Sequence, residues 1–326
     1  IGLVGSEMCI RDRLITEVKD MAAQANLKRR KTSAARRDTR AGFLFTMPVI
    51  VGFILFTVGP MLVSLYLSFT DYNMVGAANW VGVSNYQKLF SGEDPVFWKS
   101  LQVTAYYVLI GTPIYLVISL AIAMLLNRSF RGRGVTRTLL YLPAIIPTIA
   151  VAMIWKWLTD PSLGVLNNLS QLVGLNVKLS WFYSEATSIP TFILLWIWSC
   201  GTTFIVFLAG LQNVPQQLYE AMEIDGGGSF HKFVYITLPM ISPTTIFCAM
   251  VSFVTAIQCF VPSYAITNGG PNNSTMLYFY YMYREAFRFL KMGSACAIAW
   301  VLFILLLIFT QLFSQATKRW VYYGGE

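Results

Sequence analysis

The residues best suited to a specific interaction form a short polar segment, residues 220–239. It carries Glu220 and Asp225, followed by three consecutive glycines. By contrast, residues 186–219 and 233–283 contain no Asp, Glu, Lys or Arg. The apolar stretches hold no grouping of His, Asp, Glu or paired Cys and His, so we predict no catalytic residue. The chemistry to expect of this segment is recognition of a partner.

Composition places the chain in a membrane. Of its residues 56% are hydrophobic and 12% are charged, whereas soluble proteins carry about 25% charged residues. The apolar residues form blocks nearly free of charge, each near the ~20 residues that cross a hydrocarbon core as a helix. We therefore predict an all-α polytopic membrane protein with six transmembrane helices. These helices are expected at about residues 41–70, 100–126, 138–158, 188–211, 244–266 and 293–314.

The net charge of +9 is placed where it would orient the chain. Basic clusters precede the first block, fill the turn between the second and third, and follow the sixth. Positive side chains are retained in the cytoplasm, so both termini are expected there, beside anionic lipid headgroups. This arrangement argues against nucleic acid as a partner. The last outer loop fits less well, because Arg284, Arg288 and Lys291 give it a positive excess.

The polar segment resembles the EAA loop in permease subunits of bacterial ABC importers. The residues at the family's spacing are Glu220, Ala221, Asp225, Gly226, Phe233, Ile236, Leu238 and Pro239. Met222 and Gly227 stand where the family usually has alanine. The resemblance implies an ATPase-coupling site made of Glu220, Ala221, Asp225, Gly226, Gly227, Phe233, Leu238 and Pro239. In it Glu220 would contact an arginine of a separate ATPase, and Asp225 and Gly226 would shape a turn between short helices. By composition alone, a plain interfacial loop is the better explanation of the segment, and the resemblance reverses this preference.

Two further patterns support the resemblance. The segment Thr267-Asn-Gly-Gly-Pro271, a turn at face value, resembles a marker of the first permease in maltose-type, glycerol-phosphate-type and lactose-type importers. The pattern around Asn85-Tyr86 resembles a segment of sugar-type permeases, although aromatic residues beside a span also suit the headgroup zone. The resemblance thus covers the membrane core and implies the ABC type I importer permease fold.

The partners follow from the resemblance and from one absence. No Gly-x-x-x-x-Gly-Lys-Ser/Thr segment occurs, so the chain is not expected to bind ATP through a phosphate loop or to be an enzyme. The resemblance implies two separate ABC ATPase subunits that hold ATP and Mg, a second homologous permease subunit, and a periplasmic or lipid-anchored solute-binding protein. The chain itself is expected to bind no cofactor or metal. It would lie in the bacterial cytoplasmic (inner) membrane and pass a sugar, oligosaccharide or related polyol.

Polar side chains inside spans are the candidates for the solute path, because they are costly against lipid and usually face a cavity. The candidates are Trp198, Ser199, Thr202, Ser252, Thr255, Gln258 and Cys259. All except Gln258 also align with positions that contact sugar in the maltose permease. Ala256 and Cys259 replace asparagines of that family, which leaves identical specificity open. The alternative for the Ser and Thr residues is hydrogen bonding between helices.

The competing function is a self-sufficient secondary transporter or channel. It predicts ionisable residues inside the spans or inverted repeats. Among Asp, Glu, Lys and Arg, the expected spans hold only Lys156, at the outer end of the third, where snorkelling to the surface explains it, and they show no repeat. The five cysteines form no Cys-x-x-Cys pair, so we expect neither a disulfide framework nor a zinc site. The single histidine, His231, is expected to be a surface residue of the polar loop.

The expected organisation has five parts. Residues 1–13 resemble translated sequencing adapter and are expected not to be native. They are followed by a basic cytoplasmic tail (14–40), the first transmembrane helix with its outer loop (41–99), a five-helix transport core (100–314) with a cytoplasmic coupling loop (212–243), and a cytoplasmic C-terminal tail (315–326).

Overall fold

A computed structural model describes residues 39, 41–172 and 180–317. The adapter-like segment, nearly all of the basic tail and residues 318–326 therefore lie outside the described residues. Apart from a two-residue antiparallel pair, in which β1 (Thr70–Asp71) meets β2 (Asn79–Trp80), the regular elements of the described chain are helical.

The chain forms two compact units, residues 1–64 and 65–326. The described part of the first unit is one long helix, which continues as α2 (Gly59–Ser68) for a total of 28 residues from Ala41 to Ser68. A π-helical turn, η1 (Ile54–Val58), precedes Pro60 and lets Gly59 donate its N–H to the Ile54 carbonyl. A wider turn at this point suits a proline, which lacks the N–H donor of a regular helix. The side chains of this helix in the first unit are exposed or half-buried.

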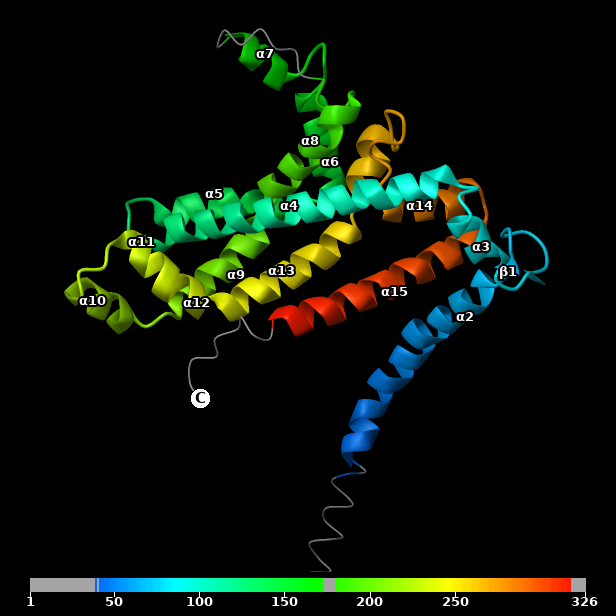
Figure 1. Cartoon of the computed structure of the whole chain (residues 1–326), viewed down its shortest axis with the longest axis horizontal. Helices are drawn as coiled ribbons and strands as arrows, with labels where there is room; N and C mark the ends of the chain where they lie inside the picture. The colour runs from blue at the N-terminus through cyan, green and yellow to red at the C-terminus, as the bar shows by residue number, and fades with distance from the viewer. Residues whose placement is uncertain (1–38, 40, 173–179, 318–326) are drawn as a thin grey trace, which may run out of the picture. The chain divides into compact units, whose positions relative to one another are not determined.

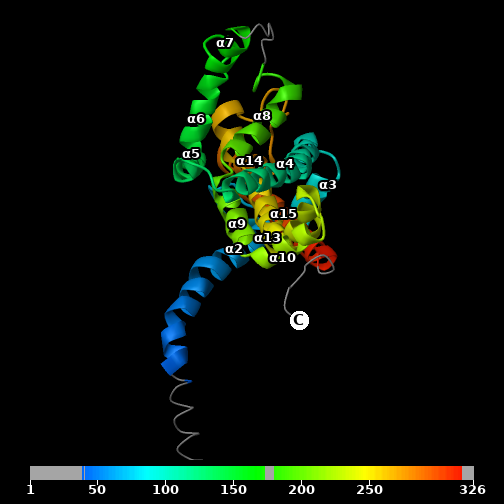
Figure 2. The same ribbon diagram turned by 90° about the vertical axis from the view of Figure 1, so that its left-hand side faces the viewer.

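In the second unit the long helix α4 (Pro95–Asn127) packs along α8, α9 and α13. Figure 1 shows α4, α13 and α15 running side by side, and Figure 2 shows α5, α6 and α7 along one side of this group. The elements before the polar loop are α3 (Ser84–Phe90), α4, α5 (Arg133–Ile145), α6 (Thr148–Leu158), α7 (Val165–Leu172), α8 (Glu185–Trp198) and α9 (Gly201–Gln212). Those from the loop onward are α10 (Gln216–Ile224), α11 (Ser229–Lys232), η2 (Phe233–Thr237), α12 (Leu238–Met240), α13 (Ser242–Ile257), η3 (Ser263–Thr267), α14 (Tyr278–Tyr283), η4 (Arg284–Arg288) and α15 (Met292–Thr317).

Among the described residues, three helices are long and apolar enough to cross a membrane by themselves: Ala41–Ser68, Pro95–Asn127 and Met292–Thr317. Three helix pairs pass the same test together but bend at a short break, by 99° between α5 and α6, 52° between α8 and α9, and 67° at the start of α13. There are thus three candidate spans, or up to six if each bent pair is one span. The helices predicted as continuous over 138–158 and 188–211 are broken, and α13 ends at Ile257 although a span was expected to reach 266.

Asn85 and Tyr86 form side-chain hydrogen bonds at the end of α2. The amide of Asn85 donates to the carbonyls of Ser68 (2.9 Å) and Thr70 (3.0 Å). The Tyr86 hydroxyl donates to Ser68 Oγ at 2.8 Å. These bonds satisfy carbonyls that a helix end leaves without intrahelical partners, so α3 fixes the point where the first long helix stops.

Candidate functional site

A cavity of about 370 Å³ lies where the breaks between α5 and α6 and between α8 and α9 meet the C-terminal end of α13. Ile146 and Thr148 flank the break between α5 and α6, Ser199 caps α8, and Gln258 caps α13; all four line the cavity. Inside a membrane protein, unwound backbone is tolerated where it faces protein or a polar cavity. Discontinuous helices at such a place are typical of solute sites in transporters.

The polar part of the lining comes from residues predicted for the solute path. Ser199, Thr202, Thr255, Gln258 and Cys259 all line this one cavity, from two broken helices. Thr202, Thr255 and Gln258 are exposed within this chain, and the described lining residues include no charged side chain. The Thr255 hydroxyl donates to the Val251 carbonyl (2.8 Å) and keeps its lone pairs as acceptors. Such a lining suits a neutral ligand with many hydroxyl groups.

Two of the predicted path residues lie outside this lining. Trp198 is 40% exposed and its ring contacts Trp155, with centroids 6.0 Å apart. α8 ends at Trp198, and of these two neighbours only Ser199, the residue that caps the helix, lines the cavity. Ser252 is buried one turn before Thr255, where the cavity-lining part of α13 begins.

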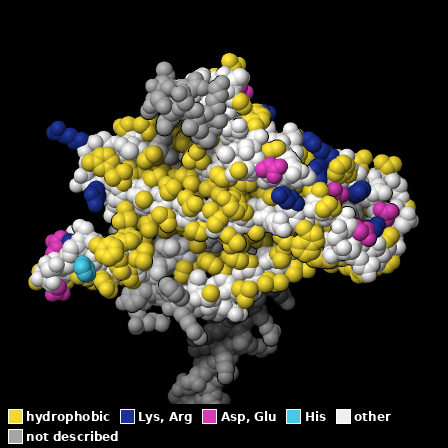
Figure 3. Space-filling view, turned by 45° about the horizontal axis from the view of Figure 1, so that its top comes forward, with side chains coloured by type: hydrophobic (Ala, Val, Ile, Leu, Met, Phe, Trp, Pro, Cys, Tyr) yellow, Lys and Arg dark blue, Asp and Glu magenta, His cyan; other side chains and the backbone are white. Residues whose placement is uncertain are grey.

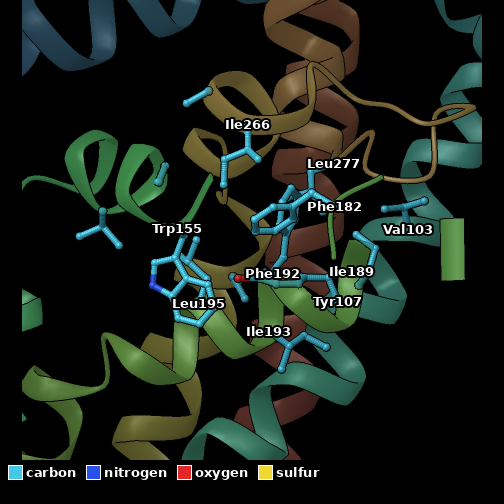
Figure 4. Packing of buried hydrophobic residues seen from close by; sticks show 14 of the residues in the cluster. Val103, Tyr107, Trp155, Phe182, Ile189, Phe192, Ile193, Leu195, Ile266 and Leu277 are labelled. Atoms are coloured by element: carbon cyan, nitrogen blue, oxygen red, sulfur yellow. The ribbon is translucent and has the colours of Figure 1, made fainter. Parts of the chain in front are cut away.

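Aromatic residues missed by the sequence analysis form another wall. Tyr107 of α4 and Trp196 of α8 line the cavity, with ring centroids 5.5 Å apart. Trp196 also stacks on Tyr115, with centroids 4.3 Å apart and planes inclined by 12°. Beside this wall lies a buried apolar cluster that includes Tyr107, Phe192 and Leu195 (Figure 4). In a chain with 15% aromatic residues, no sequence signal separates these rings from ordinary packing.

The second candidate site is the polar loop, which forms α10, a glycine turn and α11 (Figure 1). α10 ends where Asp225 N–H bonds to the Ala221 carbonyl (3.1 Å) and Gly227 N–H to the Met222 carbonyl (2.8 Å). Gly226 has φ +78°, a left-handed conformation that residues with a Cβ disfavour. The predicted short helix–turn–helix is therefore present, with Glu220, Ala221 and Asp225 exposed.

The segment that follows the glycine turn, from α11 to η2, is bonded to α10. The Tyr219 hydroxyl and Thr237 Oγ1 lie 2.9 Å apart in a hydrogen bond, and Lys232 pairs with Glu223. Of the predicted coupling residues here, Phe233 is half-buried at the start of η2, while Leu238 is 42% exposed and Pro239 half-buried. The bonds of Tyr219 and Lys232 were not foreseen, because their partners lie 18 and 9 residues away.

The loop also exposes apolar side chains beside its acids. Ile224 is 87% exposed, Phe230 75% and Tyr235 67%. In Figure 3 acidic side chains and the single histidine lie at this end, next to hydrophobic ones, while hydrophobic side chains cover the broad middle of the visible face. Exposed apolar side chains grouped in this way indicate a protein interaction site.

Met222 and Gly227, the two departures from the family's alanines, touch each other. A Cβ on Gly227 would lie 2.5 Å from both Cγ and Sδ of Met222 and 2.9 Å from its carbonyl oxygen. The larger side chain at position 222 therefore occupies the space that glycine leaves at 227.

The family model of the binding-protein-dependent transport system inner membrane component matches residues 115–319. The chain belongs to this family. A relative, the probable ABC transporter permease protein YesP of Bacillus subtilis (strain 168), is 38% identical over 300 residues, covering 91% of this chain and 96% of YesP. The lactose transport system permease protein LacF of Rhizobium radiobacter is 32% identical over 288 residues, covering 85% of this chain and 95% of LacF.

A solved structure shares the fold of this permease. It is a chain of a bacterial alginate ABC transporter, crystallised in complex with an alginate pentasaccharide-bound periplasmic protein, with a TM-score of 0.75 and 22% identity. The match covers 86% of this chain and 96% of that one. These findings confirm the predicted importer permease, and the relatives are transporter permease subunits rather than enzymes.

Proposed function

We propose that this permease passes a sugar, oligosaccharide or related polyol through the cavity between the two helix breaks and the end of α13. The observation that carries the proposal is the composition of the lining: hydroxyl and amide groups of Thr202, Thr255 and Gln258, aromatic rings, and no charge among the described lining residues. The hydroxyl groups of a neutral saccharide can bond to these hydroxyl and amide groups, and its apolar ring faces can pack on the aromatic rings. The names of LacF and of the alginate transporter support a carbohydrate as the class.

The proposed topology has six spans, with both termini in the cytoplasm of a bacterium whose inner membrane holds the protein. Each bent helix pair then counts as one span, and the breaks between α5 and α6 and between α8 and α9 lie in the membrane beside the cavity. This choice puts the basic turn between α4 and α5 on the cytoplasmic side, in agreement with the rule that positive residues stay inside. It also puts α10 and α11 in the cytoplasm.

The exposed loop from α10 to α12 is the proposed contact with one of two ATPase subunits. Its acids would meet basic groups of the ATPase, and Ile224 and Phe230 would bury apolar surface there. The hydrogen bond between Tyr219 and Thr237 joins α10 to η2. A rotation of the loop would therefore carry α9 and α13 with it and give alternating access to the cavity. ATP and Mg would be held by the ATPases, and a second permease subunit and an outer solute-binding protein would complete the importer.

The test is gentle detergent purification of this chain from its native membrane, with mass spectrometry of its companions. We expect a stoichiometric ATPase and a second permease, and ATP-dependent saccharide uptake after reconstitution with the binding protein. A chain that purifies alone and moves solute in vesicles without ATP would contradict the proposal and favour a secondary transporter.

A further inference from the structure

Four aromatic rings lead from the cavity to an exposed surface. Phe260 lines the cavity and stacks on Tyr264, with centroids 5.1 Å apart and planes inclined by 19°. Tyr283 contacts both rings, at 4.9 Å from Phe260 and 5.5 Å from Tyr264. Phe287 follows at 5.1 Å from Tyr283. Phe260 and Tyr283 are half-buried, whereas Tyr264 is 37% exposed and Phe287, at the far end, is 54% exposed. We name these four residues the aromatic ladder.

The far end of the aromatic ladder lies among charged groups. Phe287 stands in η4 between Arg284 and Arg288, and the Arg288 guanidinium donates to Asn268 Oδ1 at 3.1 Å. Charged side chains are costly in hydrocarbon, so this end belongs at the water-facing side of the membrane. In the proposed topology that side is the outer one, from which the solute arrives.

The Thr-Asn-Gly-Gly-Pro marker holds the aromatic ladder in place. The buried Thr275 hydroxyl donates to the Gly270 carbonyl (2.7 Å) and bonds Thr267 Oγ1 (2.7 Å), while the Ser263 hydroxyl donates to the Thr275 carbonyl (2.8 Å). Gly269 has φ +84°, and a Cβ there would lie 2.3 Å from Met276 Cε and 3.3 Å from the ring of Tyr280. The marker is thus a hydrogen-bonded loop that is tightly packed at Gly269, directly after the segment that carries Phe260 and Tyr264.

We propose that the aromatic ladder is a second saccharide subsite, which takes sugar rings beyond those held in the cavity. The C–H faces of a pyranose ring are apolar and pack on aromatic rings, while the hydroxyls at its edge keep their water. Rigid aromatic side chains offer such area at a low cost in conformational entropy. The transported unit is then an oligosaccharide. This inference rests on the proposed function and adds the chain length of the substrate.

The experiment uses the complete transporter in ATP-loaded vesicles, with the binding protein outside. The vesicles receive chains of one to six rings from partial hydrolysates of starch, galactan, xylan and alginate, and mass spectrometry reads the imported material by chain length. The variants are Tyr264→Ala and Phe287→Ala, with Tyr264→Phe as the conservative change. Phe247→Ala is the matched control, because Phe247 is 59% exposed on α13 and outside the aromatic ladder.

We expect each alanine variant to lower import of chains of three or more rings by about threefold to tenfold relative to shorter ones, the range for one aromatic contact. Tyr264→Phe and Phe247→Ala should keep the wild-type length profile. An equal loss at every chain length would mean that the rings only anchor the protein at the membrane surface, and would overturn the inference. So would an unchanged profile, or a wild type that imports single rings alone. If the wild type imports no saccharide of the panel, the proposed function itself fails.

Discussion

The polar loop and the cavity differ in how their residues come together. The loop from α10 to α12 is one continuous piece of chain, in which neighbours in sequence are neighbours in space. The cavity draws its lining from α4, α5, α6, α8, α9 and α13 and from the segment after it. Sequence spacing therefore specifies the loop, whereas the cavity depends on where separate helices break and how they pack. Variants of the two sites should fail in different ways.

The largest effect is expected for Gly226→Asp. An L side chain at φ +78° costs about 1–2 kcal/mol, and the new carboxylate stands beside Asp225 on the face that would dock the ATPase. We expect the protein to insert normally and uptake to fall to the level of vesicles without ATP. Gly228→Asp is the matched control, because Gly228 has φ −76°, open space around it and the N-cap position of α11, where Asp is favourable. Normal uptake by Gly226→Asp would refute the coupling role.

A smaller effect is expected in the cavity from Gln258→Leu. The change removes an exposed amide and leaves solute hydroxyls without a partner, which costs about 1–3 kcal/mol, or roughly fivefold to 150-fold in apparent KM. The reference variant is Ser252→Ala, since Ser252 is buried outside the lining. It should change the free energy of solute binding by no more than about 0.5 kcal/mol. Equal losses for the two variants in uptake assays over a range of solute concentrations would contradict the assignment of this cavity.

A still smaller effect on uptake is expected inside the loop, at the contact between Met222 and Gly227. Gly227→Ala alone should weaken ATPase binding and uptake, because the added Cβ meets Met222. Adding Met222→Ala, which gives both of the family's alanines, should recover part of the loss. A double-mutant cycle on the thermal stability of the purified complex should give a coupling energy of about 0.5–3 kcal/mol. Strict additivity would show that the two positions are independent.

The smallest effect is expected outside both sites, for Tyr86→Phe. The change removes the hydroxyl that bonds Ser68 Oγ and should lower the free energy of unfolding by about 1 kcal/mol. A thermal melt in detergent measures this loss. Uptake kinetics should match the wild type, and a raised KM would mean that α3 takes part in solute binding.

Sequence reasoning predicted the helical class and the regions of the apolar helices, because hydropathy depends on composition alone. It did not predict which helices break. Pro113 lies inside the continuous helix α4, whereas Pro147 marks a bend of 99° between α5 and α6, although both prolines occur in similar apolar surroundings. Neighbouring helices decide the outcome by satisfying or leaving free the carbonyls that a proline releases.

The sequence also did not show where helices pack closely against each other. Gly201 begins α9 at a point where a Cβ would lie 2.7 Å from Ala144 Cβ, so α5 approaches α9 more closely than a side chain allows. Gly210 has the same relation to Thr244, at 2.8 Å from its Oγ1. In one sequence such glycines look like any other glycine of an apolar helix. Five of the seven solute-path candidates do line the cavity. Tyr107 and Trp196, which also line it, were missed because the sequence does not show which aromatic side chains the helix packing brings to the cavity.

The helix breaks and the helix end that meet at the cavity also bear on how the range of transported solutes can change in such a permease. Thr202, Thr255 and Gln258 sit at or near the breaks and are exposed within this chain, so they contribute little to the tightly packed helix contacts that keep the protein folded. Mutations at these positions alter what the lining offers to a solute without loosening the scaffold. Evolution can therefore retune selectivity here at little risk to folding, as loops at the rim of a rigid barrel let one enzyme scaffold serve many reactions.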